Sequence, residues 1–218
     1  MGELILQLLP ELAGMAVTPA AIAGCVLLLQ TKRALANAFA FFGAFMIAYT
    51  AIGVAALLGG ATHETSRSGA VSHWAGLVVG LVFLAFGMWQ LIRRRSPSDT
   101  GPEWMQQLAD AKPRGAFIMG AALSIVNPNL AIMISGMTVI AAAETTPGAA
   151  VFGTVLLLSA AALDFLVPIA VYAAFGDRAK SALGAVKQWM ITHERPLTLT
   201  VFFGFGALFV VRNLVALL

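Results

Sequence analysis

The sequence is poor in the residues from which most enzyme sites are built. It has one cysteine, Cys25, and three histidines, and only 11% of its residues are charged. One thiol cannot form an intrachain disulfide or a dithiol redox pair, and the histidines lack the close spacing of metal ligands. Cys25 is therefore expected to be a small apolar packing residue. Because no apolar run contains a Ser–His or Asp–Asp pair, the sequence supports neither an enzyme nor a cofactor or metal site.

Apolar residues fill most of the chain. They make up 60% of its 218 residues, and the mean hydropathy is +0.89. A soluble domain needs more polar surface, so lipid is expected to be the main solvent. The first apolar stretch contains Glu3 and Glu11 where a signal peptide has a basic flank, and it is too long for a cleavable one. We therefore predict an all-α membrane protein that keeps its first helix.

Six apolar runs are the predicted transmembrane helices, since about 20 residues span a bilayer. They lie at residues 4–29, 34–58, 74–92, 115–143, 148–175 and 197–218.

Basic residues alternate between the connecting segments. Of the 13, eleven lie in the first, third and fifth segments: Lys32, Arg33, Arg93, Arg94, Arg95, Lys112, Arg114, Arg178, Lys180, Lys187 and Arg195. The second segment has only Arg67. The positive-inside rule places the basic segments in the cytoplasm. The predicted location is therefore the inner (cytoplasmic) membrane of a bacterium, in a multi-pass topology with both termini outside.

Two basic connections contain amphipathic stretches. Trp104 lies on the apolar face of residues 103–112, and Trp189 on that of residues 178–191. The pattern is typical of short helices on the cytoplasmic leaflet, with basic residues near anionic headgroups. Ordinary membrane-surface connectors would show the same pattern, so no function is assigned to these segments.

The chain divides into two halves of three helices, residues 1–95 and 114–218, within one transmembrane domain. An odd number of helices per half gives related halves opposite orientations. Pro19 in the first helix and Pro128 in the fourth each remove a backbone hydrogen bond and should break or kink their helices. In transporters with inverted repeats, paired breaks of this kind point to the binding site. We therefore predict two inverted-topology three-helix repeats.

Four polar side chains inside the spans are the predicted substrate or coupling site, together with the two prolines: Thr18, Asn127, Asn129 and Asp164. At 1.5 Å per residue, Thr18 lies about 21 Å from the outer end of its helix. Asn127 and Asp164 lie about 18 Å and 16 Å from the inner ends of theirs. All lie near the midplane, where polar groups are costly in hydrocarbon and therefore expected to cluster.

Each of these groups has two interpretations. Asp164 could be a carboxylate that takes up and releases a proton during transport. Alternatively, it is a structural acceptor that caps the backbone freed at Pro168 or bonds to Asn127. The Asn127–Pro128–Asn129 segment either binds or gates a substrate, or it repairs the broken helix.

A second predicted contact joins the first and last helices. Glu11 and Arg212 lie about 10 Å and 9 Å from the outer ends of their helices. We predict a structural ion pair between them; in the alternative, Arg212 extends outward to the membrane surface.

Three segments together resemble a known family. They are AVTPAAI at residues 16–22, KRALANAF at 32–39 and GAALSIVNPNL at 120–130. Their order and spacing are similar to the GAP family, the glycopeptidolipid- and sulfolipid-addressing proteins of mycobacteria and related actinobacteria, within the LysE transporter superfamily. The resemblance covers essentially the whole chain. It departs from the family pattern at Asn129, where lysine is common, and at Asp164, where a neutral residue is expected.

The resemblance implies a six-helix LysE-like fold and a role in moving a cell-envelope glycolipid across the inner membrane beside a larger lipid exporter. The expected partners are membrane lipids, such an exporter and a second copy of the chain, but not nucleic acid. Two alternatives stay open: a proton-coupled LysE-type exporter of amino acids or cations, and a non-transporting scaffold of a lipid-export machine. A lipid pathway should open sideways and be mainly apolar, whereas a solute pathway should be ringed by polar groups.

Overall fold

The computed structural model describes residues 2–61, 68–92, 111–143 and 145–217. Within these ranges the chain is helical apart from short connections, which confirms the all-α prediction. The predicted amphipathic segment 103–112 lies outside the described residues except for its last two positions.

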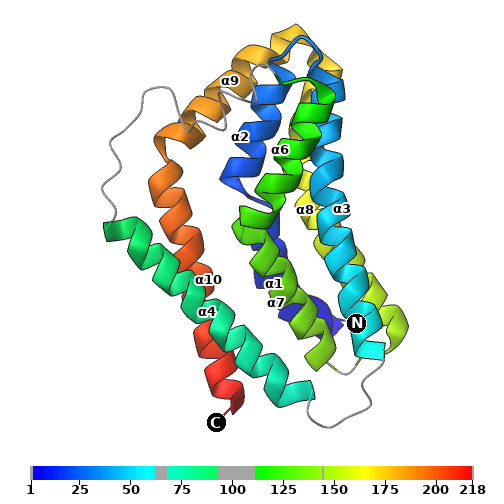
Figure 1. The fold of residues 1–218 in the computed structure, drawn as a ribbon, viewed down its shortest axis with the longest axis vertical. Coiled ribbons are helices and arrows are strands. Elements are labelled where there is room, and N and C mark those ends of the chain that lie inside the picture. The colour runs from blue at the N-terminus through cyan, green and yellow to red at the C-terminus, as the bar shows by residue number, and fades with distance from the viewer. Residues whose placement is uncertain (1, 62–67, 93–110, 144, 218) are drawn as a thin grey trace.

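The helices of the described ranges follow the predicted spans closely (Figure 1). In chain order they are α1 (Gly2–Met15), α2 (Pro19–Leu29), α3 (Ala34–Ala61), α4 (Ser68–Ile92), α6 (Pro113–Val126), α7 (Pro128–Ala142), α8 (Pro147–Phe175), α9 (Asp177–Thr192) and α10 (Glu194–Leu217). Helix α9 contains the second amphipathic segment, and it lies at the end of the bundle opposite to both termini.

Two of the predicted spans are broken helices. Helices α1 and α2 meet at 48°, and α6 and α7 meet at 58°. Pro19 and Pro128 are the first residues of α2 and α7. Proline suits this position because the first amide of a helix has no partner within the helix. Each proline therefore begins a second helix instead of bending a continuous one, whereas α8 continues through Pro168.

Counting spans by helix length and composition alone gives fewer than the six predicted. In the part of the chain that the structure describes, three helices are long and apolar enough to cross a bilayer, over Ala34–Gly59, Pro147–Phe175 and Arg195–Val215. Counting each bent pair as one span gives five. Within α4, Leu77–Ile92 is a shorter apolar helix. The chain is thus a multi-pass membrane protein with three to five spans by this measure.

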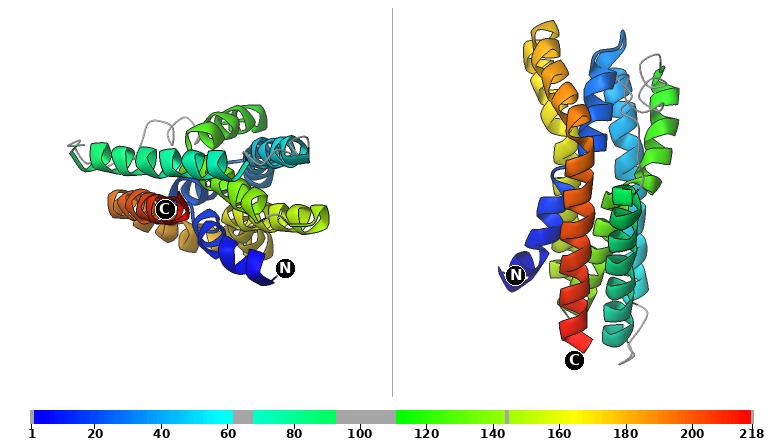
Figure 2. Two further views of the ribbon diagram at one scale, coloured as in Figure 1. Left: turned by 90° about the horizontal axis from the view of Figure 1, so that it is seen from below. Right: turned by 90° about the vertical axis from the view of Figure 1, so that its left-hand side faces the viewer.

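Helices α4 and α10 form a closely packed antiparallel pair at one side of the bundle (Figures 1 and 2). Glycines allow the approach, since a Cβ atom added to Gly80 would lie 2.9 Å from the backbone nitrogen of Val210. Aromatic rings fill the remaining contact, with Phe83 packed on Phe202 and Phe209. Close approach through small residues is a usual way for membrane helices to associate.

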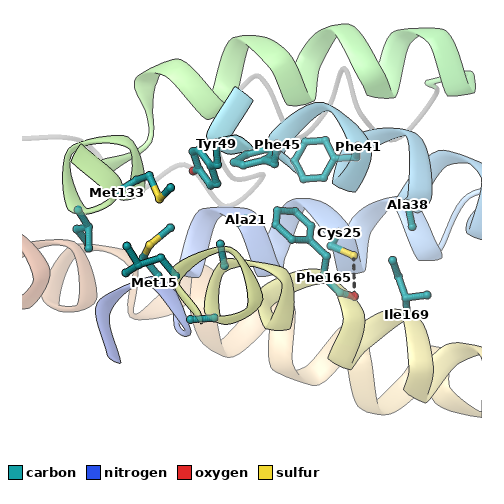
Figure 3. Packing of buried hydrophobic residues seen from close by; sticks show 14 of the residues in the cluster. Met15, Ala21, Cys25, Ala38, Phe41, Phe45, Tyr49, Met133, Phe165 and Ile169 are labelled. Carbon is teal, nitrogen blue, oxygen red and sulfur yellow. Dashed lines mark hydrogen bonds between the residues drawn. The ribbon is translucent and has the colours of Figure 1, made fainter. Parts of the chain in front are cut away.

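The apolar core lies between α2, α3 and α8 (Figure 3). Phe41 and Phe45 of α3 pack against Phe165 of α8, and Tyr49 contacts Phe45 edge-on. Cys25 of α2 is fully buried here, with its Sγ 3.8 Å from the carbonyl oxygen of Phe165. It is a packing residue in this structure, in line with the sequence-based expectation.

Replacing Gly120 by alanine should destabilise the contact between α6 and α3. A Cβ atom there would lie 2.9 Å from the Phe41 carbonyl oxygen and 3.1 Å from the Ala44 Cβ atom. We expect a loss of about 1–3 kcal/mol, because overfilling a close backbone contact forces the helices apart. Gly43→Ala on α3 is the matched control, since a Cβ atom there would meet nothing within 4 Å. A maleimide dye that reacts with Cys25 on thermal unfolding measures both variants, and equal melting temperatures would contradict the prediction.

Candidate functional site

The break between α1 and α2 is held by the side chain of Asp164 from α8. The backbone N–H of Thr18 donates to both carboxylate oxygens of Asp164, at 3.1 Å each. Thr18 has extended backbone angles, and the two residues are 5% and 2% exposed. A broken helix leaves amide groups unpaired, and an unpaired amide is costly when it is buried. The carboxylate therefore stabilises the break by accepting from the N–H that it leaves free.

The break between α6 and α7 is held by its own asparagines. The Asn127 Oδ1 atom accepts from the backbone N–H of Asn129 at 3.0 Å, which caps the start of α7. The Asn129 Nδ2 atom in turn donates to the Thr18 hydroxyl oxygen. Asn129 thus connects the second break to the first.

The four predicted residues Thr18, Asn127, Asn129 and Asp164 form one buried hydrogen-bonded chain, which we call the break cluster. The structure brings them together as the depth estimate predicted. Its connections differ from those that the sequence suggested for Asp164, because the carboxylate bonds neither to Asn127 nor to backbone near Pro168. It serves the break in the other half of the chain.

A cavity of about 330 Å³ lies beside the break cluster. Thr18, Asn127 and Asn129 contribute its polar wall, and Asp164 reaches it only through Thr18. The opposite wall comes from the α4–α10 pair and is mainly apolar. Phe86, Trp89, Val201 and Phe202 line the space there, together with two polar residues, Gln90 and Thr198. Sequence reasoning did not find these residues. The spacing of Phe83, Phe86 and Trp89 along one face of α4 was the available signal.

A second buried polar group joins α1, α7 and α10. The guanidinium of Arg212 lies 3.2 Å from the Glu11 Oε1 atom, which also accepts from the Ser135 hydroxyl at 3.2 Å. Arg212 donates to the Gln7 carbonyl oxygen as well, at 3.3 Å. Glu11 is fully buried, whereas the Arg212 side chain is 33% exposed. The two residues that were expected to pair are therefore in contact, and Ser135 is a partner that the sequence did not identify.

The side chain of Phe205 on α10 contacts α1 one turn away from this ion pair. A Cβ atom on Gly14 would collide with the ring of Phe205. The half of α10 that contains Phe205 and Arg212 is therefore held against α1. The half that contains Val201 and Phe202 faces the cavity instead.

A comparison with known protein families shows to which family the chain belongs. A family model described as Sap, sulfolipid-1-addressing protein, matches residues 8–214. The chain belongs to the sulfolipid-1-addressing protein family. The match includes both helix breaks, the break cluster and the Glu11–Arg212 pair, and it confirms the resemblance to the GAP family. No curated protein and no solved structure matches the chain.

Membership in the sulfolipid-1-addressing protein family and the apolar helices together indicate a membrane role in lipid handling. The cavity beside the break cluster is lined mainly by apolar residues, with five neutral polar ones: Thr18, Gln90, Asn127, Asn129 and Thr198. Among the residues that the structure describes, no group of three or more His, Cys, Asp or Glu residues could hold a metal ion.

Proposed function

We propose that this chain itself moves a cell-envelope lipid or glycolipid across the inner membrane. The observation that carries the proposal is the meeting of two broken helices, one from each half, at a buried polar cluster beside an apolar cavity. Irregular backbone at membrane depth occurs where it is buried in protein or lines a cavity. In transporters such paired breaks form the substrate site around which the halves move.

The proposal includes six spans in two inverted halves with a LysE-like fold. Helix α4 has 25 residues over Ser68–Ile92, about 37 Å at 1.5 Å per residue, which is enough for a sixth span. The basic positions at 32–33 and 112–114 lie at the same end of the bundle as α9, and both termini lie toward the other end (Figure 1). This arrangement supports a cytoplasmic position for α9 and termini outside.

An exporter of amino acids or cations fits the cavity less well. Such a pathway should be ringed by polar groups, whereas the α4–α10 wall is mainly apolar, with four apolar residues beside Gln90 and Thr198. A scaffold role is the second candidate, because α9 exposes Val186 and Trp189, which are 45% and 53% exposed. A larger lipid exporter could dock there.

A deletion strain tests the function through its surface lipids. We expect the extractable surface glycolipid to fall while the total cellular amount is kept, since synthesis does not need the chain. Complementation with Asn129→Ala should fail at normal protein levels, because this change disconnects the two breaks. We expect about a tenfold loss of surface lipid relative to complementation with the wild type. Complementation with Trp189→Ser should succeed.

The scaffold role predicts the opposite pattern. Asn127→Ala, Asn129→Ala and Asp164→Asn would then be tolerated, and Trp189→Ser on α9 would abolish complementation. An unchanged surface profile in the deletion strain, together with altered tolerance to amino acids or metals, would instead support the solute exporter.

A further inference from the structure

The cavity beside the break cluster has two chemically different walls. The α4–α10 wall is mainly apolar, with Gln90 and Thr198 as its polar residues, while Asn127 contributes an amide group to the other wall. The Asn127 Oδ1 atom is used within the break, and of the described residues none accepts from its Nδ2 atom. A group with hydrogen-bond acceptors would therefore find a donor at Asn127 in a mainly apolar space.

The cavity has no charged lining among the described residues. Asp164 is withdrawn behind Thr18, and the basic side chains of α9 and α10 do not reach the space. A phosphate, sulfate or ammonium group would lose its hydration there without gaining a counter-charge, which is strongly unfavourable. The ligand that fits is an alkyl chain whose polar end is neutral, such as an ester or amide carbonyl or a hydroxyl.

Access to the cavity is lateral. Val126, at the end of α6, lines the space and is 78% exposed, and Val17 and Trp89, which also line it, are 57% and 47% exposed. In a membrane protein, exposed apolar side chains face lipid tails. On the far side of the break, contact between Gly14 and Phe205 and the Glu11–Arg212 pair close α10 against α1. Met190 of α9 also lines the cavity, which places α9 on the side of the cavity away from this contact.

We propose that the cavity takes one acyl chain of a lipid from the leaflet next to α9, with the neutral linkage of that chain at Asn127 and the charged headgroup left outside. The inference rests on the proposed transport function and specifies which part of the lipid the protein holds. The chain enters between α6 and the α4–α10 pair.

Photolabelling of the full chain in vesicles tests the acyl-chain site directly. The vesicles contain phosphatidylethanolamine and phosphatidylglycerol with a trace of phosphatidylcholine that carries a diazirine midway along one acyl chain. Phe202 lines the cavity and is only 8% exposed, whereas Ile47 is 62% exposed outside it. Mass spectrometry gives the ratio of adducts at Phe202 to adducts at Ile47. Adducts at Phe202 report an acyl chain inside the cavity, and adducts at Ile47 report contact with bulk lipid.

Two neighbouring substitutions provide the matched comparison. Val126 lines the cavity, and Ile125 beside it is 67% exposed and does not. We expect Val126→Trp to lower the Phe202/Ile47 adduct ratio about tenfold by filling the entrance. Ile125→Trp should leave the ratio unchanged, which excludes a general effect of a large side chain on α6.

The outcomes separate this inference from the proposed function. Absence of Phe202 adducts in the wild type, or equal ratios in both variants and the wild type, overturns the acyl-chain site even where surface-lipid export depends on the protein. Labelling at Phe202 that Val126→Trp removes supports the site, and it does so without any requirement for transport. Labelling that both variants remove equally would mean a disturbed fold and would also overturn the assignment of the entrance.

Discussion

Replacing Asp164 by asparagine should abolish lipid export and leave the protein folded. The amide oxygen of asparagine can still accept from the Thr18 N–H, which is the bond that Asp164 makes in the structure. What the substitution removes is the ability to bind and release a proton. No basic side chain pairs with Asp164 in the described part of the chain, so the ionised form lacks a counter-charge. A buried carboxylate of this kind is costly in a membrane and is usually retained for function.

Asp164→Ala separates the structural contribution of the carboxylate from the functional one. Alanine leaves the buried Thr18 N–H without an acceptor, which costs about 1–3 kcal/mol. We therefore expect a lower melting temperature for Asp164→Ala, an unchanged one for Asp164→Asn, and no export by either. Melting is measured through the reaction of Cys25 with a maleimide dye, and export through surface-lipid extraction. Full export by Asp164→Asn would show that Asp164 only caps the break between α1 and α2 and takes no part in proton transfer.

The break cluster could be predicted because its signals lie along single helices. Proline at positions 19 and 128 marks where the backbone is interrupted, and depth follows from the rise of 1.5 Å per residue. The partner of Asp164 could not be predicted in this way. It depends on the rotation of α8 about its axis. In addition, the Asp164 carboxylate accepts from a backbone N–H, and no residue type in the sequence indicates such a donor.

The cavity was beyond sequence reasoning for a different reason. The mainly apolar wall opposite the break cluster exists because α4 and α10, far apart in the chain, pack through Gly80 and Phe209. Apolar periodicity cannot select this pairing, because every face of a membrane helix is apolar and lipid competes with protein as a partner. The same property leaves the number of spans undecided by composition at Leu77–Ile92. The contact between Glu11 and Arg212 could be predicted, since opposite charges at equal depth in the membrane have few other partners.

Loss of the Arg212 side chain should destabilise the protein more than loss of Glu11. Arg212→Ala leaves a fully buried carboxylate for which Ser135 is the one remaining side-chain donor among the described residues. Removal of one partner from a buried ion pair costs about 3–5 kcal/mol. The melting temperature should fall by on the order of 10 °C. Glu11→Ala costs less, because the Arg212 side chain is 33% exposed and can turn toward the membrane surface.

The double variant Glu11→Ala/Arg212→Ala determines whether the two residues act as a pair. Once Glu11 is absent, Arg212→Ala no longer strands a buried charge, so the double variant should be more stable than Arg212→Ala alone. The effects should then be non-additive by about 2 kcal/mol, within the range found for contacting residues. The single variant Glu11→Ala measures the packing that is lost with the Glu11 side chain, which the double variant loses as well. Strictly additive losses would show that Arg212 is held by the Gln7 carbonyl and the lipid surface, and that Glu11 is stabilised by Ser135 alone.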